Sequence, residues 1–127
     1  MRLPELLPCL AAPILILGVL AASVARAEGD REAGRKISIE HCTRCHVVGD
    51  ANPNGGINST PSFQLLARRD DWRERFETFF ARRPHPVFVR VPGVPPWTDL
   101  PSVIEPFTVT LEQVEDIVSF IETLEPK

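Results

Sequence analysis

The five residues Cys42-Thr43-Arg44-Cys45-His46 constrain this chain more than any other stretch of it. They read C-x-x-C-H, the spacing by which c-type haem is attached to protein. Two thiols three positions apart can each add to one vinyl group of a porphyrin, and the histidine that follows is placed to bind the iron as its proximal ligand. The motif therefore predicts one covalent haem c at Cys42 and Cys45, with His46 bound to the metal.

A C-x-x-C pair on its own also occurs in zinc sites and in redox dithiols. A zinc site needs two further ligands at short spacing, and the remaining cysteine, Cys9, lies in a segment expected to be removed. A thioredoxin-like dithiol would need a βαβ pattern around it, which the sequence does not show. Haem attachment is therefore the favoured interpretation.

The first 27 residues have the layout of a secretory signal peptide. An apolar run from Leu6 to Ala22 is followed by Ala25-Arg26-Ala27, an A-x-A cleavage pattern. The alternative is an uncleaved membrane anchor, but the run is shorter than the roughly 20 residues that a spanning helix prefers. We expect a signal peptide over residues 1–27 and one mature domain over residues 28–127 in the periplasm, in contact with a membrane only if the leader is retained.

The mature domain is small and mildly acidic. Losing Arg2, Arg26 and Glu5 with the leader turns totals of 14 basic and 17 acidic residues into a net charge of about −4. No basic run offers a binding surface for nucleic acid, so nucleic acid is not expected as a partner. A domain of this size has a thin core, which a haem among apolar side chains would enlarge. The sequence leaves the oligomeric state open.

Two terminal helices are predicted by capping signals and apolar periodicity. Asp30 can cap a first helix that runs to about Glu40. Thr110 and Gln113 form a capping box at the start of a last helix. Its apolar stripe is Leu111, Val114, Ile117, Val118, Ile121 and Leu124, with Phe120 at the edge. Gly34 in the first helix costs roughly 1 kcal/mol relative to alanine, so it indicates either a close crossing with another element or a tolerated weak spot.

Shorter helices are predicted between these two. Residues 47–60 are rich in Gly, Asn and Pro and should form a loop. Thr60-Pro61 would be the N-cap and first residue of a short helix, and Asp71 with Glu74 resembles a capping box. The helix after Asp71 would end near Arg83, with one aromatic face made of Trp72, Phe76, Phe79 and Phe80.

No regular structure is predicted from residue 84 to residue 109. Seven prolines, at positions 84, 86, 92, 95, 96, 101 and 106, exclude a long helix and a central strand. A loop of this length within a compact domain is unusual and tends to be functional.

The mature chain as a whole resembles the class I cytochromes c. The stretch from Gly29 to Ile37, which leads into the C-x-x-C-H motif, is similar to the first helix of that family. The resemblance implies an all-α cytochrome c fold around one haem, with a long proline-rich loop before the last helix. It also implies that Gly34 packs against Phe120 where the first and last helices cross.

The resemblance extends to the proximal side of the haem. Thr60-Pro61-Ser62-Phe63 is similar to the segment that follows the motif in the family. It implies that the Pro61 carbonyl accepts the Nδ1–H of His46, a bond that orients the ring and makes the ligand more basic. Pro61 and Phe63 are therefore expected beside the cofactor. His41, next to the motif, is expected to be exposed to solvent.

The resemblance breaks on the distal side. The family usually completes the iron coordination with a methionine before the last helix, whereas the single methionine here is Met1. Many bacterial relatives have His-Pro-Pro-Met where this chain has His85-Pro86-Val87-Phe88, and phenylalanine has no atom that binds iron. His85 is one candidate for the sixth ligand. The alternatives are a five-coordinate or water-bound iron under Phe88 and Val89, and a backbone or amine ligand.

These features predict a protein that passes single electrons between periplasmic redox proteins and is not an enzyme. The sequence shows no paired carboxylates, nucleophile elbow or phosphate-binding loop that would indicate an enzymatic reaction. An open distal site would instead suit a haem-based gas sensor or a weak peroxidase. A third possibility is the haem subunit of a periplasmic dehydrogenase, with the proline-rich loop as the interface.

Overall fold

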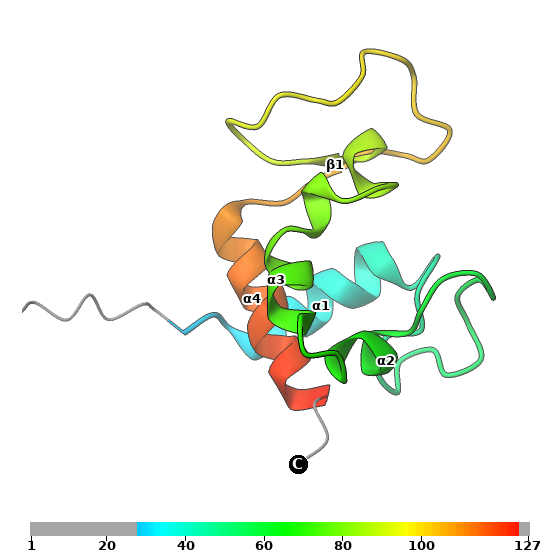
Figure 1. The fold of residues 1–127 in the computed structure, drawn as a ribbon, viewed down its shortest axis with the longest axis vertical. Helices are drawn as coiled ribbons and strands as arrows, with labels where there is room; N and C mark the ends of the chain where they lie inside the picture. The colour runs from blue at the N-terminus through cyan, green and yellow to red at the C-terminus, as the bar shows by residue number, and fades with distance from the viewer. Residues whose placement is uncertain (1–27, 125–127) are drawn as a thin grey trace, which may run out of the picture.

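The computed structural model describes residues 28–124, so the predicted signal peptide lies outside the described residues. Helix α1 (Arg31–Cys42) lies near the start of this range and helix α4 (Leu111–Ile121) near its end. The two helices cross each other and form the centre of the fold (Figure 1). Most regular structure in the described range is helical, and the strands within it are two residues long. The predicted all-α class is confirmed.

Short elements connect these two helices. They are α2 (Phe63–Ala67), α3 (Trp72–Glu77), the 3-10 turns η1 (Phe79–Ala81) and η2 (His85–Val87), and the strands β1 (Val89–Arg90) and β2 (Phe107–Thr108). A further 3-10 turn, η3 (Glu122–Leu124), follows α4.

Strands β1 and β2 pair in parallel, with Val89 opposite Phe107. The expectation that residues 84–109 have no regular structure was therefore wrong at both ends of that stretch. The pairing draws the two ends of the proline-rich segment together, and residues 91–106 extend from the helical body as a loop (Figure 1).

The N-terminal capping of α1 and its close crossing with α4 are both confirmed. The Asp30 carboxylate accepts hydrogen bonds from the backbone N–H groups of Glu32 and Ala33. A Cβ atom on Gly34 would lie 1.9 Å from the carbonyl oxygen of Asp116, so only glycine allows the two backbones to approach this closely. The three atoms nearest that position belong to the α4 backbone at Asp116 and Ile117. The contact with Phe120 that the resemblance implied stays a prediction.

The capping box of α4 is confirmed, since the side chains of Thr110 and Gln113 each bond the other residue's backbone N–H. The buried face is wider than the predicted stripe and also includes Ser119 and Phe120. Leu111, at the first position of the helix, is 58% exposed because its turn precedes the crossing with α1.

The start of α2 differs from the prediction, whereas α3 begins after Asp71 as predicted but without the capping box. Helix α2 begins at Phe63, with the Ser62 hydroxyl as its cap. Pro61 stays outside the helix because its carbonyl serves another partner, described below. At α3, the Asp71 side chain makes no capping bond, because its carboxylate accepts from Arg69 and Arg75 instead.

The aromatic helix predicted to reach Arg83 ends at Glu77. Thr78 has φ −123° and ψ 14°, outside the helical range, and the chain then continues as the η1 turn. Phe76 remains buried on α3, whereas Phe79 follows the break and is directed by η1.

The core consists of two buried clusters. The larger lies among the four helices and contains Val48, Phe63, Ala67, Phe76, Ile117, Val118, Phe120 and Ile121. The smaller contains Val89, Val91, Val109 and Val114, and packs the ends of the proline-rich loop onto α4. Ile37 and Phe79 contact both clusters, so the space between the two groups is bounded by apolar side chains on both sides.

Candidate haem-binding site

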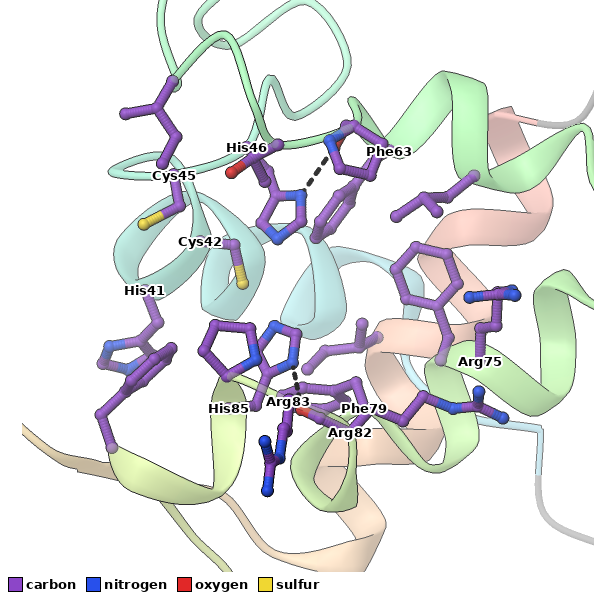
Figure 2. A pocket seen from close by; sticks show the side chains of 18 of the residues that line it. His41, Cys42, Cys45, His46, Phe63, Arg75, Phe79, Arg82, Arg83 and His85 are labelled. Atoms are coloured by element: carbon purple, nitrogen blue, oxygen red, sulfur yellow. Dashed lines mark hydrogen bonds between the residues drawn. The ribbon is translucent and has the colours of Figure 1, made fainter.

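A cavity of about 480 Å³ lies between α1, the segment that follows it, and the residues from α3 to η2. Figure 2 shows side chains from all three regions directed into it. The seven residues singled out from the sequence all line this cavity: Cys42, Cys45, His46, Pro61, Phe63, His85 and Phe88. The fold thus brings together positions up to 46 residues apart in the chain.

The motif lies in a tight turn at the end of α1. The backbone N–H groups of Cys45 and His46 both donate to the carbonyl of Cys42, at 3.1 and 2.8 Å. This turn puts the two thiols on one side of the cavity (Figure 2), and both are free of disulfide bonds. Burial raises the pKa of the Cys42 thiol to about 12, and the neighbouring Cys45 adds to the rise.

His46 is oriented by one strong backbone contact. Its Nδ1 lies 2.7 Å from the carbonyl oxygen of Pro61. Because a carbonyl can only accept, Nδ1 carries the proton and Nε2 keeps its lone pair for the cavity. Burial lowers the pKa of His46, although the bond to Pro61 opposes the effect. The ring is therefore held neutral, as a metal ligand must be.

His85 has the same arrangement on the opposite wall. In η2 its Nδ1 lies 3.0 Å from the carbonyl oxygen of Arg82, so its Nε2 is again the free acceptor. The rings of Phe79 and Phe88 meet it edge-on, with centroids at 5.4 and 5.8 Å. Burial lowers the pKa of His85, partly offset by the Arg82 bond, and the charge of His46 would lower it further.

The two imidazoles face each other across the cavity, each with its hydrogen-bonded nitrogen turned away (Figure 2). Their centroids are 6.2 Å apart and their planes are within 8° of parallel. This separation is too large for stacking contact. Two imidazoles that share a metal ion at ~2 Å from each Nε2 have centroids about 6 Å apart, so the space between His46 and His85 fits one bound metal.

Phe88 and His41 occupy the side of the cavity near the strands. Phe88 packs against Phe107 of β2, with centroids 6.3 Å apart. His41 was expected to face solvent, but its ring stacks on Phe107 at 4.3 Å and its side chain is 27% exposed. The prediction failed because β2 comes from a distant part of the chain and covers the imidazole.

Asn52 is a supporting residue that no motif in the sequence predicted. Its Oδ1 accepts from the N–H of Val48 at 2.8 Å, and its Nδ2 donates to the carbonyls of Thr43 and His46 at 3.1 and 3.0 Å. These three bonds tie the loop back onto the motif. The one signal in the sequence was an asparagine in a Gly- and Pro-rich loop, where Asn often bonds nearby backbone.

The donor set and its surroundings fit haem c and do not resemble a site for a bare ion. Residues 28–124 contain no group of three or more His, Cys, Asp and Glu side chains that could hold a metal alone. They do provide two free thiols, two neutral imidazoles and apolar walls around one cavity. No helix in that range is long and apolar enough to cross a membrane.

Comparison with known proteins agrees with this fit. Residues 31–125 match the family model described as Cytochrome c. The chain is similar to the curated cytochrome c-552 of Bradyrhizobium diazoefficiens, with 28% identity over 112 residues that cover 88% of this chain and 91% of the relative. The comparison with solved structures gives no significant match. On the family model, the chain belongs to the cytochrome c family.

Proposed function

We propose that this protein is a periplasmic single-electron carrier whose haem iron is bound by both His46 and His85. As a member of the family it carries covalent haem c, and Cys42 and Cys45 supply the attachment thiols. The observation that carries the proposal is the pair of parallel, neutral imidazoles that face each other with centroids 6.2 Å apart. When bound, the haem supplies a one-electron couple of its iron.

The residues around the two imidazoles suit electron transfer because they fix both rings. Each Nδ1 is bonded to a backbone carbonyl, Pro61 for His46 and Arg82 for His85. Phe79 and Phe88 pack against the edges of the His85 ring. Ligands held in this way keep their positions in both oxidation states, so little rearrangement accompanies a change of charge.

Ligation by two histidines should also shift the reduction potential relative to that of a haem with one methionine and one histidine ligand. A methionine ligand raises the potential of c-type haem, and the described residues contain no methionine. We therefore expect a potential below that of a relative with one methionine and one histidine ligand. Partners of low potential, exported to the same compartment, would be the matching electron donors and acceptors.

The alternative functions make different demands on the same site. A gas sensor or peroxidase needs a vacant sixth position, and the facing Nε2 of His85 argues against one. Docking on a larger redox enzyme is compatible with the carrier role. The proline-rich loop supports it, because that loop exposes large apolar side chains, namely Val94, Trp97, Leu100 and Val103. We further propose that residues 1–27 are the signal peptide that directs export.

Optical and paramagnetic resonance spectra of the purified protein test the ligation. We expect low-spin ferric and ferrous forms. The ferric optical spectrum should lack the weak long-wavelength absorption band that marks a methionine–iron bond. The near-parallel imidazole planes, 8° apart, should give a rhombic low-spin resonance rather than a single large g value. His85→Ala should convert the iron to high spin and open it to carbon monoxide.

His41→Ala is the matched control, because His41 also lines the cavity but stacks on Phe107 instead of facing His46. This variant should stay low-spin. A parent protein that is already high-spin and binds carbon monoxide readily would show that His85 is not a ligand. The sensor or peroxidase alternative would then be favoured.

A further inference from the structure

The charges that line the cavity are of one sign. Three arginines border it, Arg75, Arg82 and Arg83, whereas no aspartate, glutamate or lysine is among the lining residues. This concentration of positive charge contrasts with a mature domain that is acidic overall. Arg75 and Arg82 also pair with Asp71 and Glu74 outside the lining. What the two arginines offer is therefore the guanidinium N–H donors that these pairs leave unused, which suit a ligand with carboxylate oxygens.

Two of these arginines lie on the side of the cavity away from the thiols. In Figure 2, Arg75 and Arg82 are across the imidazole pair from Cys42 and Cys45. Arg83 points elsewhere, since its guanidinium lies 4.3 Å from the centre of the Trp97 ring in the proline-rich loop. Arg75 and Arg82 are therefore the pair available to a bound ligand.

Both guanidinium groups are held in place by hydrogen bonds to side chains in or next to α3, and each keeps N–H donors that these bonds do not use. Arg75 donates through Nε to Asp71 at 2.9 Å, and within residues 28–124 its two Nη atoms make no hydrogen bond. Arg82 donates through Nε to Thr78 and through Nη2 to Glu74, both at 2.8 Å, which leaves Nη1. Their side chains are only 34% and 38% exposed, so an ion pair formed there is less screened than one on the open surface.

We propose that Arg75 and Arg82 bind the two propionate carboxylates of haem c. The propionates are on different pyrroles from the vinyl groups that react with the thiols, which agrees with arginines placed away from Cys42 and Cys45. The planar fork of a guanidinium matches a carboxylate better than any other side chain does. The inference rests on the covalent haem of the proposed function but not on the identity of its sixth ligand.

The reduction potential of the holoprotein gives the first test. Arg75→Gln and Arg82→Gln should each leave a propionate charge uncompensated and so favour the ferric form. We expect a shift of the ferric-to-ferrous ratio by roughly threefold to tenfold, where tenfold is about 59 mV for a one-electron couple. Arg75→Lys keeps the charge and should recover most of the shift.

Arg73→Gln is the matched control. Arg73 is on the same short helix and pairs with Glu77 and Glu122, but it does not line the cavity. It loses the same charge without losing a contact to the proposed ligand, so its shift should be several-fold smaller. Equal shifts for all three glutamine variants would overturn the proposal.

A second measurement removes the carboxylates instead of the arginines. A Cys42→Ala/Cys45→Ala protein reconstituted with haem in vitro can hold it only without covalent bonds, so haem can be compared with its dimethyl ester. We expect haem to bind roughly tenfold or more tightly than the ester, and Arg75→Gln/Arg82→Gln to abolish that preference. Equal affinity for haem and ester would contradict the proposal. If the thiol-free protein fails to bind haem, the potentials of the covalent holoprotein decide.

These measurements separate the two proposals. A high-spin parent would refute ligation by His85, yet the potential series and the ester comparison would still report on Arg75 and Arg82. Conversely, a low-spin parent whose arginine variants behave like Arg73→Gln would leave the iron ligands intact and refute propionate binding alone.

Discussion

Replacing Gly34 by alanine tests the contact on which the fold depends most. A Cβ at this position would lie 1.9 Å from the carbonyl oxygen of Asp116 and 2.8 Å from the backbone nitrogen of Ile117. Both atoms belong to the α4 backbone, so no side-chain rotation can relieve the overlap. Since non-bonded heavy atoms pack at ~3.5 Å or more, α1 and α4 would have to separate by over ~1 Å.

The cost follows from that separation. A gap of ~0.5–1 Å forfeits about a quarter to a half of the dispersion energy of the atoms that part, and overpacking typically costs about 1–3 kcal/mol. Against this cost, alanine stabilises a helix by roughly 1 kcal/mol relative to glycine. The upper end of the overpacking cost applies, because the clash is with backbone atoms that no rotamer change can move away. We therefore expect Gly34→Ala to lower the free energy of unfolding by ~2 kcal/mol, and Gly34→Val to lower it further.

Urea unfolding of the ferric holoprotein, followed by far-ultraviolet circular dichroism, measures this loss. With a slope of ~2 kcal/mol per molar urea, the midpoint should fall by ~1 M. Gly93→Ala is the control, because a Cβ there meets nothing within 4 Å and only the backbone conformation, with φ +82°, is strained. Its cost should be ~1 kcal/mol. A Gly34→Ala protein with the parent's midpoint would refute the backbone-to-backbone crossing.

Three further predictions concern the site. Acid–acetone should leave the haem on the protein, and changing Cys42 or Cys45 to alanine should leave one thioether bond and little holoprotein, as mass spectrometry would show. Asn52→Ala should destabilise the holoprotein by ~1.5–4.5 kcal/mol in urea, since it removes three hydrogen bonds worth ~0.5–1.5 kcal/mol each. Asn52→Asp keeps the acceptor for Val48 but sets a carboxylate oxygen against the carbonyls of Thr43 and His46, so it should lose at least as much. A variant as stable as the parent would contradict this account. Adding Phe88→Met to His85→Ala should restore a low-spin spectrum and raise the potential, and an unchanged high-spin spectrum would show that residue 88 does not reach the iron.

The features predicted correctly from the sequence are those set by neighbouring residues. The Asp30 cap and the Thr110–Gln113 capping box each depend on side chains within three positions of the backbone they bond. The close helix crossing was indicated by Gly34, because a glycine inside a helix usually needs a packing reason.

The features that were missed depend on contacts between distant segments. The start of α2 shifted from Pro61 to Phe63 because the Pro61 carbonyl bonds His46. His41 is covered by Phe107, which lies 66 positions further along the chain. No local pattern encodes such partners. The sequence was enough to name His85 as a candidate iron ligand. That its ring faces His46 could be seen only in the folded structure.

The pairing of β1 with β2 makes the size of the proline-rich loop independent of the iron site. His85 is directed by η2 before the strands begin, and three buried valines at the strand ends, Val89, Val91 and Val109, pack against Val114 of α4. A closed loop is lengthened cheaply, since doubling its length costs only about 0.6 kcal/mol of closure entropy. Residues 92–103 could therefore be exchanged for a segment of different length and sequence, with Ile104 kept because it lines the cavity. Such an exchange would give the domain a new partner without rebuilding its redox centre.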